Sequence, residues 1–284
     1  MHLVTYATPR YEASRQRLLR SAKQWGDFKC WSFSSADFSK TARFRQHRDV
    51  TCTARGGGLW LWKPHYILEV LAQLRDGEHL VYLDAGIELI APIDPLMPLC
   101  ERSRGVALFR VHGRLNRHWT KRDCLVLMHC DVPPFLDTEQ TMSGIIVLKK
   151  SEFVVNLMQE WLHYAADRRI VSDDPNTCGL PNYEGFVEHR HDQSILNNLR
   201  IKHGLAGYTD PTQWGSPYRH LAGRGIDDYP TLLNLHRERR PSWRTATRLL
   251  LRDPQRFARG LRHHVMLWVG KPGQKERATD KVGS

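Results

Sequence analysis

Asp84 is the first residue whose position suggests chemistry, because it directly follows the apolar run at residues 80–83. Such an uninterrupted run is typical of a central strand that is buried on both faces. In open α/β sheets, ligands bind outside the carboxyl ends of the strands. A carboxylate there can hold a hard divalent cation against a diphosphate, and Gly86 leaves space for that approach. The alternative is an aspartate that only accepts hydrogen bonds from nearby backbone in a turn.

A glycine-rich segment forms the second candidate. Three glycines at positions 56–58 lie between Arg55 and Lys63. Consecutive glycines let backbone N–H groups approach an anion, and Lys63 stands where a helix N-terminus would favour negative charge. The alternative is a plain loop whose Trp60 and Trp62 anchor it to the core.

A dense polar run at residues 188–193 is the third candidate, and it comes immediately before an apolar helical pattern. Asp192 suits the N-cap of that helix, which is the purely structural alternative. Five further polar groups exceed what capping needs. The chemical alternative is that the carboxylate of Asp192 and the amide of Gln193 serve an anomeric carbon, where a cation must be stabilised and an acceptor hydroxyl deprotonated.

His236 is the fourth candidate, because it follows the apolar pattern at residues 231–235. A late histidine at a strand end can complete a metal site that an early aspartate begins, since imidazole suits manganese as well as zinc. The alternative is an ordinary surface histidine.

The elements that must position these residues alternate between strands and helices, which predicts an α/β fold with a largely parallel sheet. The expected strands are residues 2–7, 30–33, 80–83, 106–111, 144–148 and 231–235. The expected helices are residues 11–24, a segment that Lys63 and Pro64 open and Gly77 follows, 153–164 and 193–200. Residues 167–184 are rich in Asp, Pro, Asn and Gly and are expected to be loop.

Composition sets the outer limits. With 284 residues and 41% hydrophobic content, the chain can bury a sizeable core. No apolar run approaches the roughly 18 residues that span a bilayer, and Met1 leads directly into a strand without a secretory leader. Six dispersed cysteines without a Cys-x-x-Cys pair favour reduced thiols. We therefore expect a cytoplasmic protein.

Four segments together resemble glycosyltransferases of the GT-A fold, particularly the glycogenin-like and lipopolysaccharide galactosyltransferase type and related capsular or viral sugar transferases. Residues 82–86 look like the strand-end Asp-x-Asp position of that family. Residues 141–150 look like its acceptor-side strand, and residues 191–197 are similar to its Asp-Gln segment. His236 matches its late metal-binding histidine. The order along the chain agrees over roughly residues 1–240.

The resemblance implies a sugar transferase that uses a nucleoside-diphosphate sugar and a glycan or lipid-linked acceptor hydroxyl. Asp192 and Gln193 would lie beside the anomeric carbon as catalytic residues, and Asp84 and His236 would bind Mn²⁺ or Mg²⁺. The implied donor-binding residues are Thr5, Tyr6, Ala7, Arg10, Arg55, Trp62, Lys63, Asp84, Ala85 and Gly86. The implied acceptor and sugar contacts are Ser143, Gly144, His189 and His191.

One departure concerns the metal. Gly86 stands where the family has its second Asp, and Glu88 lies two residues further along. Either fewer protein ligands hold the metal, or Lys63 and Arg55 neutralise the departing diphosphate instead.

The last part of the chain carries most of the positive charge. Residues 237–284 contain 13 Lys and Arg against 4 Asp and Glu, whereas residues 1–236 contain 29 against 26. We expect residues 1–240 to form the catalytic domain and residues 241–284 a basic amphipathic helical tail. Such a tail either lies on the anionic inner membrane surface or packs on the catalytic domain.

Two other classes of function stay open at this stage. The cationic tail suits a protein that binds nucleic acid or another polyanion, or a transferase that places sugar on nucleic acid. A metal-dependent hydrolase would use Asp84, His189, His191 and His236. The donor sugar, the base, the acceptor, the stereochemistry and the oligomeric state are not readable from the sequence.

Overall fold

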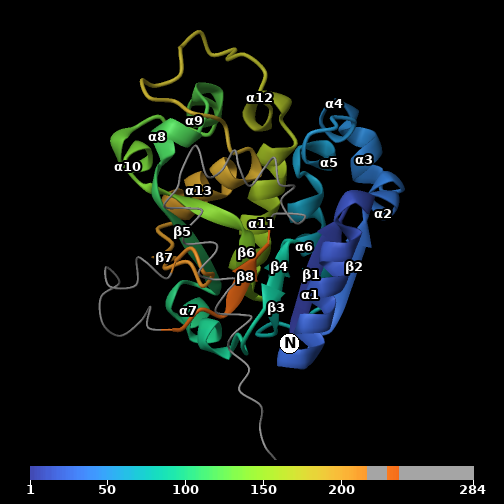
Figure 1. Cartoon of the computed structure of the whole chain (residues 1–284). Coiled ribbons are helices and arrows are strands. Elements are labelled where there is room, and N and C mark those ends of the chain that lie inside the picture. The colour runs from blue at the N-terminus through green and yellow to red at the C-terminus, as the bar shows by residue number, and fades with distance from the viewer. Residues whose placement is uncertain (216–228, 237–284) are drawn as a thin grey trace, which may run out of the picture. The chain divides into compact units, whose positions relative to one another are not determined.

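Six strands form the central sheet of the computed structural model, in the order β2-β1-β3-β6-β5-β7 (Figure 1). The structure describes residues 1–215 and 229–236. The strands are β1 (His2–Ala7), β2 (Lys29–Ser34), β3 (His79–Leu83), β5 (Val106–Leu115), β6 (Glu139–Lys149) and β7 (Gly207–Tyr208). β1 pairs in parallel with β2 and β3, and β5 with β7, whereas β6 runs antiparallel to both of its neighbours. The sheet is therefore mostly parallel, as the sequence predicts.

The order of the first three strands creates a switch point in the sheet. From β1 the chain passes to β2 on one side, and β3 then lies on the other side of β1. A crevice at the carboxyl ends of two such strands is the usual ligand position in open α/β sheets. Tyr6 and Ala7 end β1 there, and Asp84 follows β3 there.

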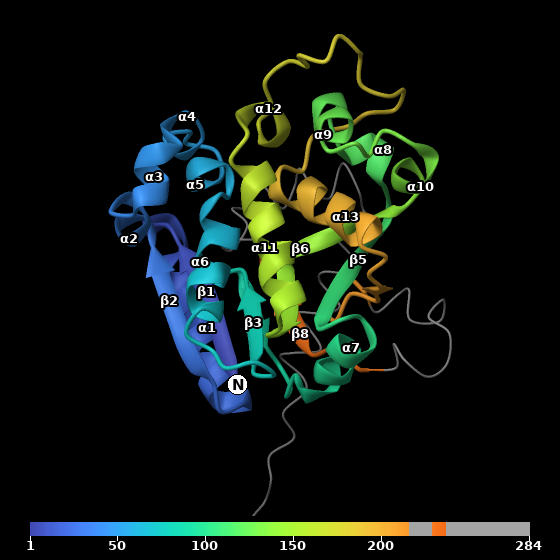
Figure 2. The same cartoon turned by 180° about the vertical axis from the view of Figure 1, so that it is seen from behind.

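Helices cover both faces of the sheet, as Figures 1 and 2 show from opposite sides. One face packs against α1 (Glu12–Trp25) and α7 (Met97–Arg102). The other packs against α6 (Trp62–Leu71), α11 (Glu152–Ala165) and α13 (Asp192–Lys202). Alternate residues of β3 divide between the two layers: Leu80 and Tyr82 face the second group of helices, and Val81 and Leu83 face the first. Burial on both faces explains the unbroken apolar run before Asp84.

The main predicted elements are confirmed with small shifts at their ends, but several short elements escape the sequence patterns. The strand expected at residues 231–235 is β8 (Leu233–Leu235), which pairs with β4 (Ile87–Leu89) in a separate two-stranded sheet. The expected loop at 167–184 begins with a helix, α12 (Arg168–Val171). The other unpredicted α-helices are α2 (Ser35–Ser39), α3 (Ala42–Gln46), α4 (Arg48–Thr51), α5 (Gly56–Leu59), α8 (Asn116–Trp119), α9 (Arg122–Leu127) and α10 (Pro133–Leu136).

The described residues all fall within one compact unit that spans residues 1–237. Over those residues, no helix is both long enough and apolar enough to cross a membrane. The amphipathic tail expected at residues 241–284 lies outside the described residues, as does the boundary expected at residue 240.

Candidate functional site

Two carboxylates converge on one buried ammonium group at the carboxyl end of β3. The Nζ atom of Lys63 lies 2.6 Å from Oδ2 of Asp192 and 3.5 Å from Oδ1 of Asp84. The side chain of Lys63 is 1% exposed and that of Asp192 is 5% exposed, whereas Asp84 is 35% exposed. Three predicted site residues, far apart in sequence, therefore form one cluster with an open carboxylate and a closed one.

Each member of this cluster comes from a different element. Lys63 is in the first turn of α6, Asp84 follows β3, and Asp192 is the first residue of α13. Asp192 does not act as the N-cap, because that position belongs to His191. The backbone carbonyl of Asp192 accepts a hydrogen bond of 3.1 Å from Nε1 of Trp161 on α11, which fixes the start of the helix.

The electrostatic environment keeps Lys63 charged. Burial alone would lower the pKa of Lys63, but the carboxylates of Asp192 and Asp84 outweigh that effect and raise it. The ammonium also donates to the carbonyl oxygen and to Oγ of Ser143, each at 3.2 Å. One positive charge thus faces two carboxylates, which leaves the cluster with a surplus negative charge.

Asp84 is held on two sides. The hydroxyl of Tyr82 donates a hydrogen bond to its Oδ1. Burial first, and then the carboxylate of Asp84, raise the pKa of Tyr82 well above its usual value, so the phenol stays a proton donor. On the other side, a Cβ at Gly144 would lie 2.7 Å from Oδ2 of Asp84. Gly144 is therefore the residue that makes room for this carboxylate.

The glycine-rich segment is a left-handed turn rather than an open anion cradle. The φ angles are 62° at Gly56, 60° at Gly57 and 97° at Gly58, and they stay positive at Leu59 and Trp60. The N–H groups of Gly57, Gly58 and Leu59 already donate to the carbonyls of Ala54, Thr53 and Arg55. Lys63, which we expected to meet a diphosphate directly, is instead buried against the carboxylates.

Arg55 and Trp60 reach across to the residue before Asp192. Nε of Arg55 lies 2.9 Å from Nε2 of His191 and 3.0 Å from Oδ2 of Asp173. The ring of Trp60 stacks on that of His191, with centroids 4.8 Å apart. These contacts therefore link the glycine-rich turn to the segment that leads into Asp192.

The two histidines expected at the acceptor side are buried and hydrogen-bonded within the protein. His189 contacts the carbonyl of Ile170 through Nε2 at 2.9 Å and accepts from the backbone N–H of Lys121 through Nδ1 at 3.2 Å. Burial lowers the pKa of His189 well below its usual value, and neighbouring His191 and Lys121 lower it further. His191 contacts the carbonyl of Val171 through Nδ1 at 2.8 Å.

The end of β1 is apolar and aromatic. Thr5 and Ala7 are buried, and Tyr6 stacks on Trp62 with ring centroids 3.9 Å apart. Burial raises the pKa of Tyr6 to about 12. A Cβ at Gly57 would lie 3.8 Å from the hydroxyl of Tyr6, so the turn passes over this stack. Arg10 is exposed just beyond it, and its guanidinium lies 5.7 Å from the centre of the Tyr11 ring.

The remaining predicted residues divide between the cluster and its surroundings. Ala85 is buried behind Asp84. The Nε2 atom of Gln193 donates a hydrogen bond to Oε1 of Gln140 at 3.1 Å, and within the described residues the Gln193 side chain is not hydrogen-bonded to the cluster. Gln140 in turn donates to Asn116 and Thr120, so Gln193 belongs to a buried amide network beneath α13.

The two predicted metal ligands, Asp84 and His236, each have a charged partner among the described residues. His236 pairs with Glu88 at 2.9 Å, and its backbone N–H donates to the carbonyl of Gly86 at 2.7 Å. Gly86 occupies the position of the second Asp in the Asp-x-Asp motif. A Cβ at Gly86 would lie 3.2 Å from the carbonyl oxygen of His236. No group of three His, Cys, Asp or Glu side chains suited to a metal occurs in residues 1–215 and 229–236. The described residues therefore offer no site with three such protein ligands, and binding of Mn²⁺ or Mg²⁺ by Asp84 and His236 stays a prediction.

Sequence reasoning missed three residues that shape the site. Tyr82 looked like an ordinary strand residue, yet it lies two positions before Asp84 and therefore points to the same side of the strand. Trp161 and Asp173 carry no local sequence signal, because their contacts join segments that only the fold brings together.

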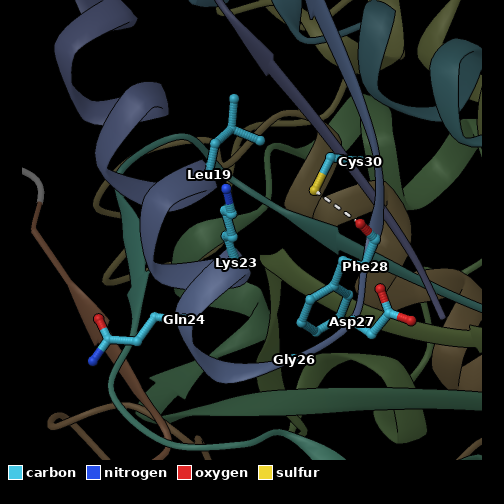
Figure 3. A pocket seen from close by; sticks show the side chains of 7 residues that line it. All are labelled: Leu19, Lys23, Gln24, Gly26, Asp27, Phe28 and Cys30. Carbon is cyan, nitrogen blue, oxygen red and sulfur yellow. Dashed lines mark hydrogen bonds between the residues drawn. The ribbon is translucent and has the colours of Figure 1, made fainter.

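A hollow in the described chain lies away from this cluster (Figure 3). It is lined by the end of α1 and the start of β2, including Lys23, Asp27, Phe28 and Cys30. This position is at the amino end of β2, opposite the edge that carries Asp84. The hollow contains no part of the carboxylate cluster, so we do not assign the chemistry to it.

Comparison with known proteins gives similarity in structure only. No protein-family model matches the sequence, and no curated protein matches it. Mouse xyloside xylosyltransferase 1 is 12% identical over 83% of this chain and 97% of its own, with a TM-score of 0.42. The galactosyltransferase LgtC, solved with donor and acceptor sugar analogues, is 13% identical over 91% of this chain and 94% of its own, with a TM-score of 0.45.

The bifunctional glycosyltransferase WbbM is 13% identical over 84% of this chain, with a TM-score of 0.48. This chain spans 46% of that longer protein. All three TM-scores lie below 0.5, so the function proposed below rests on the geometry of the site.

Proposed function

We propose that the protein is a glycosyltransferase that moves a sugar from a nucleoside-diphosphate donor to an acceptor hydroxyl. The observation that carries this proposal is the pair of carboxylates, Asp84 and Asp192, on one buried ammonium at the switch point of the sheet. That crevice is where open α/β sheets bind nucleotides.

The charge of the cluster suits a cationic transition state. Sugar transfer passes through an oxocarbenium-like state, which carries positive charge at the anomeric carbon. Lys63 compensates only one of the two carboxylates. The surplus negative charge, held in a partly buried site, stabilises positive charge more strongly than it would in water.

The reaction breaks the bond between the anomeric carbon and the diphosphate oxygen and forms a bond from that carbon to the acceptor oxygen. The bonding electrons leave with the nucleoside diphosphate. The proton of the acceptor hydroxyl passes to Asp192 if this residue is the base. If Asp192 only stabilises the sugar cation, the proton passes to the leaving diphosphate. Both routes stay open, so inversion and retention of configuration at the anomeric carbon both stay open as well.

We place the donor nucleotide at the carboxyl ends of β1 and β3, where open α/β sheets bind ligands. The buried stack of Tyr6 on Trp62 lies at the end of β1 with Thr5 and Ala7, and the exposed Arg10 follows that strand in the chain. Arg55 is the other predicted cation beside the crevice, and its side chain is 52% exposed. We propose these two arginines, rather than the buried Lys63, as the groups that face the diphosphate.

We further propose a glycan or lipid-linked acceptor, as in the synthesis of glycans, lipopolysaccharide or capsule. Support comes from the charge of residues 237–284, with 13 cations against 4 anions, which suits an anionic membrane surface. On this proposal the protein works in the cytoplasm and associates peripherally with the inner face of the membrane.

The two other classes of function have less support. A hydrolase site would need His189, His191 and His236 near Asp84, but each of these histidines is engaged elsewhere. Binding of nucleic acid or another polyanion rests on cations outside the described residues. It also assigns no role to the cluster of Lys63, Asp84 and Asp192.

The substitution Asp192→Asn tests the proposed function. Asn keeps the shape of the side chain but removes the charge, so sugar transfer should fall by about 100-fold or more. The measurement is release of nucleoside diphosphate from a panel of uridine, guanosine, cytidine and thymidine diphosphate sugars, with circular dichroism to confirm the fold. Near-normal turnover by a folded Asp192→Asn variant would remove Asp192 from the chemistry.

A further inference from the structure

His191, the residue before Asp192, has a strained backbone. Its φ is 52° and its ψ is −120°. A side chain disfavours this combination, which glycine adopts readily, and such strain persists only where the surroundings hold it in place. The dihedral angles of His191 set the direction of the peptide that leads into Asp192. They therefore decide whether the Asp192 carboxylate reaches Lys63.

Two hydrogen bonds hold the imidazole ring in one tautomer. A carbonyl can only accept, so Nδ1 of His191 carries the hydrogen and donates to Val171 at 2.8 Å. The Nε of arginine can only donate, so Nε2 of His191 accepts from Arg55 at 2.9 Å. Burial lowers the pKa of His191 and favours this neutral form.

A stacked ring completes the support. Trp60 lies against the imidazole with an angle of 27° between the ring planes. Trp60 itself has a positive φ and follows the three glycines whose left-handed conformation turns the chain. Arg55 lies at the other end of the same turn and also pairs with Asp173. The turn thus presents two side chains to one histidine.

We propose that Arg55, Trp60 and His191 are positioning residues for Asp192. They hold the strained backbone of His191, and this keeps the Asp192 carboxylate on Lys63 instead of letting it cap its own helix. The proposal rests on the proposed function, because it assumes that the placement of Asp192 limits sugar transfer. It gives the three glycines of the turn a mechanical role in place of phosphate binding, while Arg55 keeps its proposed place beside the diphosphate.

The substitution His191→Gly tests the proposal. Glycine accepts the backbone angles but removes the ring, so the backbone becomes free to rotate. A displacement of a reacting group by about 1 Å can reduce turnover on the order of 100-fold. We expect kcat to fall by that order while the KM for the donor changes little, because donor contacts remain. His191→Asn should recover part of kcat, since Asn tolerates a positive φ and keeps a donor for Val171.

Two control variants separate positioning from general damage. His129→Gly changes another histidine with a positive φ, 56°, at an exposed turn after α9, and should leave kcat unchanged. Arg75→Met removes an exposed arginine that pairs with Glu78 at 3.1 Å, away from the cluster and from α12, and should also leave kcat unchanged. Arg55→Met should lower kcat as His191→Gly does, because His191 loses the donor on Nε2, and it should also raise the KM for the donor, because Arg55 is proposed to face the diphosphate.

The outcomes distinguish the two proposals. If the wild-type protein transfers sugar and His191→Gly keeps the wild-type kcat, the positioning role is wrong and the proposed function stands. If His191→Gly and His129→Gly lower kcat equally, a more flexible backbone lowers kcat wherever it is introduced, and the positioning role of His191 is also wrong. If the wild-type protein transfers no sugar from any donor in the panel, both proposals fall.

Discussion

At the scale of single residues, the site depends on how Asp84 and Asp192 share Lys63. Asp192 is almost fully enclosed, whereas Asp84 is about one-third exposed, so the two carboxylates have different surroundings despite their common partner. Paired carboxylates in unlike environments are suited to different roles in one reaction. Asp84 is the more open of the two carboxylates, and Asp192 is the one whose position the fold fixes more closely.

The substitution Gly144→Ala tests the placement of Asp84. The added methyl group would lie 2.7 Å from Oδ2, so the carboxylate must move. We expect kcat/KM to fall by about 10- to 100-fold. The free energy of unfolding should change by no more than about 1–3 kcal/mol, the usual cost of one extra buried methyl group. Steady-state kinetics and urea unfolding measure the two effects, and an unchanged kcat/KM would show that Asp84 does not need its present position.

The sequence predicts parts of the site well and others poorly, for physical reasons. The sequence indicates Asp84 and Asp192, which the structure brings together, because a strand end and a helix start leave clear local signals; their roles stay predictions. The burial of Lys63 has no local signal, since it depends on α6 packing beside β6 and α13. His189 and His191 carried the same signal as site residues, yet their hydrogen bonds go to the carbonyls of Ile170 and Val171 on α12.

At the scale of elements, α12 and the start of α13 form the unit that holds Asp192. The segment between them is irregular, and buried neutral histidines tie it to α12.

The helices α8, α9 and α10, which the sequence does not predict, are only four to six residues long. Helices of that length show little periodicity, so packing rather than pattern determines them.

The buried His189 predicts a loss of stability in acid. Its pKa in the folded protein lies well below 6.5, the value in the unfolded chain. As pH falls below 6.5, His189 binds a proton in the unfolded state but not in the folded state, so the free energy of unfolding decreases. One such proton gives a slope of roughly 1.4 kcal/mol per pH unit. His189→Gln should reduce the slope measured by urea unfolding between pH ~7 and ~5.

His129→Gln is the matched control, because it makes the same substitution at an exposed residue in a turn. We expect a smaller slope in His189→Gln than in His129→Gln. If the two variants have equal slopes, His189 does not account for the acid sensitivity.

At the scale of the whole molecule, the chain combines a nearly neutral body with a strongly basic end. The surplus of cations in residues 237–284 is independent of the carboxylate cluster, which lies entirely within the described residues. Catalysis and attachment should therefore be separable.

A triple substitution, Arg256→Gln with Arg259→Gln and Arg262→Gln, tests that separation. Each cation near an anionic surface contributes about 1 kcal/mol to attachment. The variant should bind vesicles that contain phosphatidylserine roughly 100-fold more weakly than the wild-type protein, by sedimentation. Its turnover on a soluble acceptor should remain at the wild-type level. Equal vesicle binding by both proteins, or a parallel loss of turnover, would contradict separate roles.

The measurement that tests the central claim most directly is the change in melting temperature on adding nucleoside diphosphates and their sugars, with and without manganese. The site predicts that ligands with one base raise the melting temperature of the wild-type protein. A ligand at about 100 times its Kd stabilises by about 2.7 kcal/mol. The increase should be lost or greatly reduced in Asp84→Ala, measured relative to that variant without ligand. An equal increase in both proteins, or no increase with any nucleotide, would contradict a sugar-nucleotide site at Lys63, Asp84 and Asp192.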